Sequence, residues 1–256
     1  MAVIGLIYGG LAYLVFLASF LYAIGFVGGI LVPKSIDTGN VEALSTALLI
    51  DLVLLGIFAV QHSLMARPAF KRLWTKIIPA FVERTTYVLV SSLVLILLYW
   101  QWRPIPALVW EVHSPAGQVV LWALFCAGWL TVLTSTFMID HFDLFGLRQV
   151  WLNFSGSKYS HPPFMTNGAY RYVRHPIMLG FVIGFWATPT MSVGHLLFAL
   201  ASTMYILIAI QLEERDLAHL IGDAYREYRT RVPMLLPRLG RALRFGVWGV
   251  PKPKKA

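Results

Sequence analysis

Two short polar segments bracket the last pair of apolar runs in this chain of 256 residues. The first contains Arg171, Arg174 and His175 directly before Pro176, a residue favoured at the first position of a helix because it has no N–H to satisfy. The free N–H groups of a helix start, together with two arginines, favour binding of an anion. Interfacial anchoring at a membrane surface would explain the same side chains. The sequence therefore predicts either an anion site or an anchor here.

The second polar segment begins with Glu213 and Glu214, where the last apolar run ends. Cations, rather than acids, are expected at the C-terminus of such a helix. Two acids that break this rule indicate a functional site, where a carboxylate would accept hydrogen bonds from hydroxyl or ammonium groups. Pairing with Arg215 on a solvated face is the alternative. Tyr225 and Tyr228 follow on one helical face, where they would cover a ligand or pack at the interface.

A third polar cluster, formed by Asp140, His141 and Asp143, lies at the end of another apolar run. An Asp beside a His can orient the ring or shift its pKa, although helix capping would explain these residues equally well. His62 ends the second apolar run at the same face of the membrane. The histidines show no spacing that indicates a metal site. The single cysteine, Cys126, excludes a disulfide within one chain.

The composition of the chain indicates an integral membrane protein. Hydrophobic residues make up 58% of the sequence and charged residues only 13%, and the mean hydropathy is +0.68. Soluble domains carry about 25% charged residues. The formal net charge is +9, but the cations gather in short loops and a tail beside apolar runs. Because the positive-inside rule produces this distribution, we expect no nucleic-acid partner.

Six apolar runs position the polar clusters. A bilayer crossing needs about 20 apolar residues. Five of the runs approach this length, near 4–31, 44–65, 85–102, 117–139 and 194–212. The remaining run, 177–188, is shorter, so it would continue upstream, tilt, or turn back within the membrane. We therefore expect an all-α, polytopic helical bundle with five passes, or six apolar segments ending in a hairpin, followed by a cytoplasmic helical segment.

The charges of the loops predict the orientation. Loop 66–84 carries five cations and one acid, whereas the connections on the other side are close to neutral. The N-terminus, the segment around Arg174 and the tail are therefore expected in the cytoplasm. We interpret the chain as one membrane domain with a four-helix portion (1–139), a ligand-binding core (140–237) and a basic tail (238–256).

The segments RHPIMLG, LEERDL, GDAYREY and RVP resemble those of the membrane methyltransferases related to isoprenylcysteine carboxyl methyltransferase. The shared pattern is a Gly-x-Tyr, an Arg-His-Pro with a nearby Gly, a hairpin, a Glu-Glu pair and a Tyr-x-x-Tyr before Val-Pro. The resemblance implies that the core binds S-adenosylmethionine. The residues that it implies for this cofactor are Tyr170, Arg171, Arg174, His175, Gly180, Glu213, Glu214, Tyr225 and Tyr228.

Over most of its length from about Gln61 to Pro237, the chain also resembles the bacterial methanethiol S-methyltransferases and the NnrU-like membrane proteins. This resemblance implies transfer of a methyl group from S-adenosylmethionine to methanethiol in the bacterial inner membrane, in contact with lipids. A thiol reacts as its thiolate, so a base is expected. His141, oriented by Asp140, is the first candidate and His62 the second. Another acceptor, such as an isoprenylcysteine carboxylate or a lipid amine, or a non-catalytic membrane protein or transporter, remains the alternative.

Overall fold

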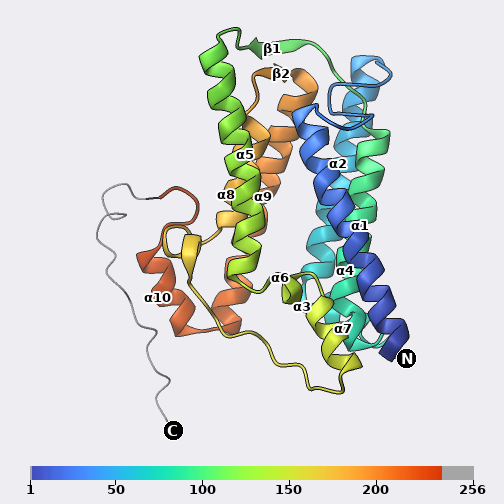
Figure 1. Cartoon of the computed structure of the whole chain (residues 1–256), viewed down its shortest axis with the longest axis vertical. Coiled ribbons are helices and arrows are strands. Elements are labelled where there is room, and N and C mark those ends of the chain that lie inside the picture. Colours follow the sequence, from blue (N-terminus) through green and yellow to red (C-terminus); the bar gives the residue numbers. More distant parts are fainter. Residues whose placement is uncertain (1, 238–256) are drawn as a thin grey trace.

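Five long apolar helices dominate the computed structural model, which describes residues 2–237 (Figure 1). Each of them is long and apolar enough to cross a membrane. The prediction of an all-α, polytopic bundle is therefore confirmed, and the chain is a multi-pass membrane protein. The predicted basic tail lies outside the described residues. The five helices are α1 (Ala2–Gly28), α2 (Leu44–Ala66), α4 (Ala80–Gln101), α5 (Pro115–Met138) and α9 (Val193–Leu220).

Short helical elements gather at one end of the bundle, which is the end where α1 begins (Figure 1). The last of them is the helical segment expected after the final apolar run. These elements carry most of the polar residues singled out in the sequence, so this end holds the candidate site. They are α3 (Pro68–Trp74), α6 (His141–Leu144), α7 (Leu147–Phe154), η1 (Gly168–Arg171) and α10 (Asp223–Arg231).

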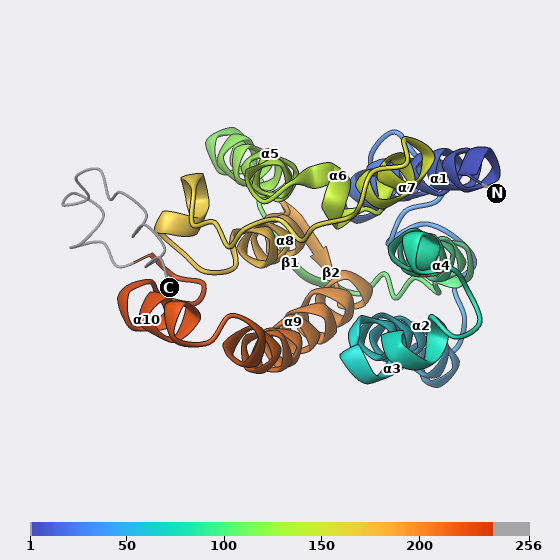
Figure 2. The same ribbon diagram turned by 90° about the horizontal axis from the view of Figure 1, so that it is seen from below.

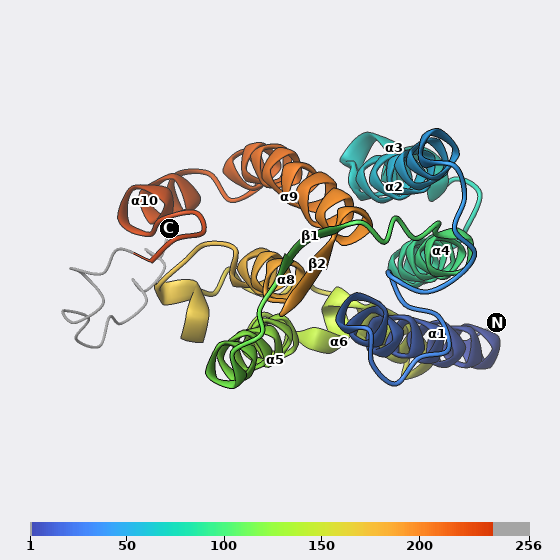
Figure 3. The same ribbon diagram turned by 90° about the horizontal axis from the view of Figure 1, so that it is seen from above.

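The short apolar run forms α8 (Pro176–Trp186), and the chain continues beyond it to the far end of the bundle. There β2 (Thr190–Ser192) pairs antiparallel with β1 (Leu108–Glu111), which precedes α5. Figure 3 shows this strand pair crossing the far end, opposite α10. The segment after α8 therefore does not turn back halfway, and α9 returns the chain to the end with the short helices. The strand pair was not predicted from the sequence.

The boundary of α9 differs from the prediction. The apolar run ends at residue 212, but the helix continues to Leu220. The segment QLEERDLAHL is rich in Leu, Glu, Arg and Ala, which favour helix whether or not the helix is buried in lipid. Glu213 and Glu214 consequently lie inside α9, and the prediction that they end the helix was wrong. Helix α4 likewise begins at Ala80, five residues before the predicted start at 85.

An aromatic core joins two groups of helices. One group contains α1, α2, α4 and α7, and the other contains α5, α8, α9 and α10 (Figure 2). Ring contacts between the groups include Phe20 of α1 with Trp129 of α5, whose centroids are 5.6 Å apart, and Trp102, directly after α4, with Phe198 of α9 at 5.8 Å. Most members of this core lie toward the strand pair. At the opposite end, polar residues from both groups approach one another.

Candidate functional site

The Arg-His-Pro segment is held by the chain that follows α10. Pro176 is the first residue of α8, and Arg174 and His175 immediately precede it. The backbone N–H of Arg174 donates to the carbonyl of Pro233 at 2.9 Å, and that of His175 donates to the carbonyl of Met234 at 3.2 Å. These two bonds bring the beginning and the end of the sequence motif together, although some sixty residues separate them.

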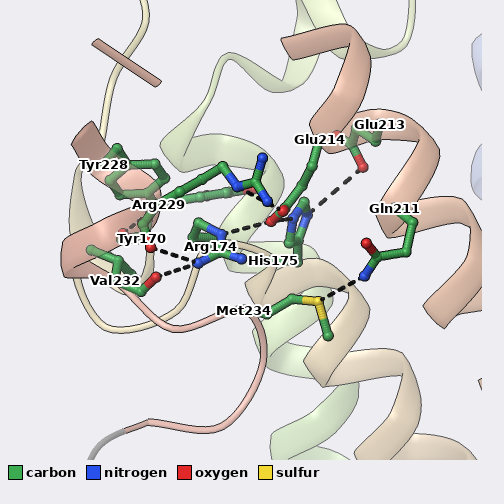
Figure 4. A network of polar contacts seen from close by, with 10 residues as sticks. All are labelled: Tyr170, Arg174, His175, Gln211, Glu213, Glu214, Tyr228, Arg229, Val232 and Met234. Carbon is green, nitrogen blue, oxygen red and sulfur yellow. Dashed lines mark hydrogen bonds and ion pairs between the residues drawn. The ribbon is translucent and has the colours of Figure 1, made fainter. Parts of the chain in front are cut away.

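Glu214 is the centre of a buried ion network beside these bonds (Figure 4). Its side chain is 3% exposed. One carboxylate oxygen accepts from Nε of Arg174 at 2.6 Å and lies 3.0 Å from Nε2 of His175. The other oxygen lies 3.2 Å from Nε of Arg229 in α10. Because three basic side chains already occupy this carboxylate, Glu214 holds the site together and has little capacity left for a ligand.

The carboxylate of Glu213, unlike that of Glu214, is available to bind a ligand. Its carboxylate lies 3.7 Å from Nδ1 of His175, and 46% of its side chain is exposed. Arg84 of α4 and Arg67 at the end of α2 are close enough to act on its charge. Glu213 therefore lies between the two groups of helices, with an oxygen available to accept a hydrogen bond from a ligand.

The tyrosines of α10 form one wall of the site. The hydroxyl of Tyr228 donates to the carbonyl of Tyr170 at 2.6 Å. The ring of Tyr225 packs against those of Tyr228 and Phe164, with centroids 6.0 and 5.9 Å away. Tyr225 is only 2% exposed, its hydroxyl has no hydrogen-bond partner within residues 2–237, and burial raises its pKa to about 12. A buried hydroxyl without a partner indicates a place for a polar ligand or water.

An open, arginine-lined cavity of about 330 Å³ at the protein surface adjoins the network. Arg174, Arg226, Arg229 and Thr230 line it. Guanidinium groups donate charge-assisted hydrogen bonds to carboxylates and phosphates, so the cavity suits an anionic group. The anion site predicted from the Arg-His-Pro segment thus has a cavity beside it, but α10 supplies most of the lining.

Two residues predicted to bind the cofactor, Arg171 and Gly180, are not part of the ion network around Glu214. Arg171, on η1, is exposed and its side chain has no partner in the described part of the chain. Gly180 lies in α8 against the backbone of Gly128 in α5. The structure thus gives Gly180 a role in helix packing, and its contact with a cofactor stays a prediction.

His141 lies apart from this network, between α1 and α5. The ring is 4% exposed, with Nδ1 lying 2.7 Å from the hydroxyl of Thr136 and Nε2 lying 2.7 Å from the hydroxyl of Tyr13. Burial lowers the pKa of His141, and the charge of Asp140 opposes this effect. Both ring nitrogens are therefore engaged in a hydrogen-bonded bridge between two helices.

Asp140 does not orient this ring by a hydrogen bond, contrary to the prediction. It is the N-cap of α6, where its side chain accepts from the backbone N–H of Asp143 at 3.1 Å. The same carboxylate lies 3.8 Å from Arg148. The capping alternative considered in the sequence therefore describes Asp140, and Thr136 and Tyr13 orient His141 instead.

His62 lies in the interface between α2 and α4. Its Nε2 is 2.9 Å from the hydroxyl of Tyr87, and its Nδ1 is 3.2 Å from the hydroxyl of Ser91. The ring also stacks on Phe58. The charges of Arg84 and Glu213 in turn act on the hydroxyl of Tyr87. The second candidate base is thus connected to the surroundings of Glu213, whereas His141 is on the opposite side of the bundle.

Sequence reasoning missed Arg84 and Tyr87. Arg84 belongs to a basic loop that was interpreted only as a marker of orientation, and Tyr87 belongs to an apolar run. In the structure Nε of Arg84 donates to the carbonyl of Leu144 at 2.8 Å, and its guanidinium lies 5.4 Å from the centre of the Tyr87 ring. Helix α4 begins before Arg84, so both residues lie on one helix. Predicting that this helix begins before residue 84 would have shown that Arg84 and Tyr87 lie on one helix, one turn apart.

The chain is similar to curated proteins over most of its length. It is 60% identical over 232 residues to methanethiol S-methyltransferase of Mycobacterium tuberculosis, which covers 91% of this chain and 95% of the relative. It is 56% identical over 234 residues to methanethiol S-methyltransferase 2 of Bradyrhizobium diazoefficiens, with 91% and 90% covered. Nurim of Mus musculus is 30% identical over 185 residues, with 69% and 70% covered.

No family model matches the chain, and no solved structure matches it. The matched regions nevertheless extend across both groups of helices and cover the positions of the Arg-His-Pro, Glu-Glu and Tyr-x-x-Tyr segments, because they span more than nine-tenths of this chain. The sequence of this protein, its five apolar helices and its similarity to these relatives lead to one assignment: the chain belongs to the methanethiol S-methyltransferase family.

Proposed function

We propose that this protein transfers a methyl group from S-adenosylmethionine to methanethiol and releases dimethyl sulfide and S-adenosylhomocysteine. The observation that carries the proposal is the 60% identity to a methanethiol S-methyltransferase across 91% of the chain. S-adenosylmethionine, when bound, supplies a methyl group made electrophilic by a sulfonium. The protein has to place this group and a thiol in line and keep water away from them.

The chemistry of the site fits such a donor. The amino-acid end of the cofactor carries a carboxylate and an ammonium group, and its ribose carries two hydroxyls. The cavity lined by Arg174, Arg226 and Arg229 suits the carboxylate. Glu213, with 46% of its side chain exposed, accepts hydrogen bonds from the ammonium group or the hydroxyls. The buried hydroxyl of Tyr225, which has no partner in the described part of the chain, is a further donor.

The acceptor has to lose a proton. A simple alkyl thiol has a pKa about two units above the cysteine reference, so deprotonation at pH 7 costs about 4–5 kcal/mol. We propose His62 ahead of His141 as the group that takes this proton. Both rings have hydroxyl groups at their nitrogens, but His62 shares its hydrogen bond with Tyr87, which is close to Glu213, whereas His141 lies between α1 and α5, apart from the ion network.

The site end of the bundle is proposed to face the cytoplasm of a bacterial inner membrane. Loop 66–84 is basic, and it lies at this end together with α3. The connections at the opposite end, which include the strand pair, carry few charges. This orientation follows the positive-inside rule and brings the site to the compartment that holds a water-soluble, charged cofactor.

The test is an assay of the purified protein in detergent or lipid nanodiscs with S-adenosylmethionine and methanethiol, in which gas chromatography of the headspace detects dimethyl sulfide. We expect the wild type to form the product and Glu111→Gln to match it, because Glu111 lies in β1 at the opposite end. Glu213→Gln should require a higher concentration of the cofactor. Methylation of a prenylcysteine or a lipid amine in place of methanethiol would change the acceptor, and absence of cofactor binding would indicate a non-catalytic protein.

A further inference from the structure

Arg84 is a cation with unused donors beside the candidate site. Its Nε donates to the carbonyl of Leu144, and its guanidinium lies over the ring of Tyr87, which is 8% exposed. The two terminal nitrogens of the guanidinium have no hydrogen-bond partner within residues 2–237. A guanidinium fixed at one nitrogen and free at the other two is well suited to hold an anion.

Arg84 and the ion network are linked through Glu213. Glu213 contacts His175, which precedes α8, and it also senses the charge of Arg84 in α4. Helices α8 and α4 belong to different groups of helices, and α9, which carries Glu213, packs against α8 and α2. Arg84 and His175 therefore both act on the carboxylate of Glu213, which would bind the cofactor.

The charges around Arg84 are mostly positive. Lys71 of α3 is partly buried, and burial lowers its pKa, as do the nearby charges of Arg84 and Arg67, against the opposing effect of Glu83. Arg67 is already paired with Asp216 at 2.9 Å. The titratable hydroxyls that face the same region from α4 and α9 are those of Tyr87 and Tyr205. The excess of positive charge favours a small anion beside Glu213.

We propose that Arg84 binds the sulfur of the acceptor and stabilises it as a thiolate. This inference rests on the proposed function. The S–H proton of methanethiol passes to the hydroxyl of Tyr87 as that hydroxyl gives its own proton to His62, and from there the proton goes to solvent, while Arg84 remains protonated throughout. The thiolate sulfur then forms a bond to the methyl carbon while the bond from that carbon to the sulfonium sulfur breaks. The electron pair of the broken bond stays on the former sulfonium, which leaves as a neutral thioether.

A fixed cation can stabilise the thiolate of the acceptor, which the two histidines cannot do. The rings of His141 and His62 both have hydroxyl groups at their nitrogens, so neither is free to hold a thiol. A nearby positive charge lowers the pKa of a thiol and makes the thiolate available at neutral pH. Arg84 would therefore be a catalytic residue that acts on the acceptor rather than on the cofactor.

The experiment compares Arg84→Gln, Arg84→Lys and the matched control Arg72→Gln, which removes an exposed cation of the same loop. For each variant, kcat/KM is measured with methanethiol and with the more acidic 2,2,2-trifluoroethanethiol between pH 7 and pH 9, and the affinity for S-adenosylmethionine is measured by calorimetry. Because burial and neighbouring cations lower the pKa of Lys71, each variant is compared with the wild type at the same pH.

We expect Arg84→Gln to lose about 100-fold in kcat/KM with methanethiol at pH 7, at the lower end of the range seen when one donor to a developing anion is removed. The loss should shrink at high pH and with the acidic thiol, because both supply thiolate without help. Arg84→Lys should retain most of the activity, Arg72→Gln all of it, and cofactor affinity should stay unchanged.

Three results would overturn the assignment of Arg84. They are unchanged kcat/KM in Arg84→Gln, an equal loss with both thiols at every pH, and a loss of cofactor affinity, which would make Arg84 a cofactor ligand. Absence of dimethyl sulfide from the wild type would instead overturn the proposed function, and the role of Arg84 with it. Activity of the wild type therefore separates failure of one proposal from failure of both.

Discussion

Gly180 of α8 faces the backbone of Gly128 in α5, so closely that a Cβ built on Gly180 would lie 2.6 Å from the carbonyl oxygen of Gly128. In the reverse direction, a Cβ on Gly128 would lie 2.7 Å from the backbone nitrogen of Gly184. Small residues let helices in membranes approach one another through their backbones. Because α8 begins directly after His175, this contact fixes the position of His175 and of its network relative to α5.

Gly180→Ala should therefore destabilise the protein. A backbone atom, unlike the end of a flexible side chain, cannot move away, so α8 and α5 must separate at a cost of about 1–3 kcal/mol. The melting temperature in detergent, followed by tryptophan fluorescence, measures the effect. Gly56→Ala is the control, because a Cβ on Gly56 in α2 meets nothing within 4 Å. Equal melting temperatures for the two variants would contradict the contact.

Substitution of Glu213 should affect cofactor binding, whereas substitution of Glu214 should affect the stability of the protein. Glu214→Gln removes the charge that pairs with Arg174 and His175, which are both nearly buried, so we expect a loss of stability of about 3–5 kcal/mol. Glu213→Gln should leave the melting temperature close to that of the wild type and weaken binding of S-adenosylmethionine by about 1.5–3 kcal/mol, as for a hydrogen bond to a charged group. Thermal unfolding and calorimetry measure the two quantities. The reverse pattern would exchange the two roles.

His141 should contribute to stability in a pH-dependent way. Its pKa in the folded protein is below the ordinary value of 6.5 because the ring is buried. As the pH falls, the unfolded chain therefore takes up this proton first, so the contribution of His141 is complete above pH 6.5 and is lost below it. The melting temperature of the wild type should fall more steeply between pH 6.5 and pH 5 than that of His141→Gln.

The same variant tests the role of His141 in catalysis. As a bridge between Tyr13 and Thr136, His141 can be replaced with little change in kcat in the protein that remains folded. A large fall in kcat, with unchanged cofactor affinity and partial recovery at high pH, would instead show that His141 is the base.

The orientation of the bundle can be tested with single cysteines in a Cys126→Ser background. His113, between β1 and α5, is 80% exposed, and Ser157 is exposed in the segment after α7. A maleimide that does not cross membranes should label His113→Cys in intact spheroplasts and Ser157→Cys only after permeabilisation. Labelling in the opposite order would place the site outside the cytoplasm.

Hydropathy predicted the five long helices because a membrane core imposes a minimum apolar length that few other structures require. It did not predict where α9 ends, because Glu213 and Glu214 are compatible with helix although they are not apolar. It also missed the strand pair, since β1 and β2 are four and three residues long and stabilise each other across a large sequence separation.

The residues of the candidate site were easier to find than their roles. The spacing of Arg174, His175 and Glu214 in the motif indicated that they belong together, and the structure joins them within hydrogen-bonding distance. Adjacency in the sequence, in contrast, did not predict which side chains are in contact. Asp140 is next to His141 in the chain, yet the hydroxyls that hold the ring come from α1 and α5, and only the packing of helices brings Tyr13 there.

The uneven distribution of contacts has a mechanical consequence. The aromatic core and the strand pair join the two groups of helices at one end, whereas polar contacts such as Arg67–Asp216 and Ser63–Tyr205 join them at the other. At the polar end, water at the membrane surface can solvate the groups that separation exposes, whereas at the aromatic end separation loses the close packing of the rings. The two groups of helices are therefore joined by packing at one end and by solvent-exchangeable polar contacts at the end that holds the candidate site.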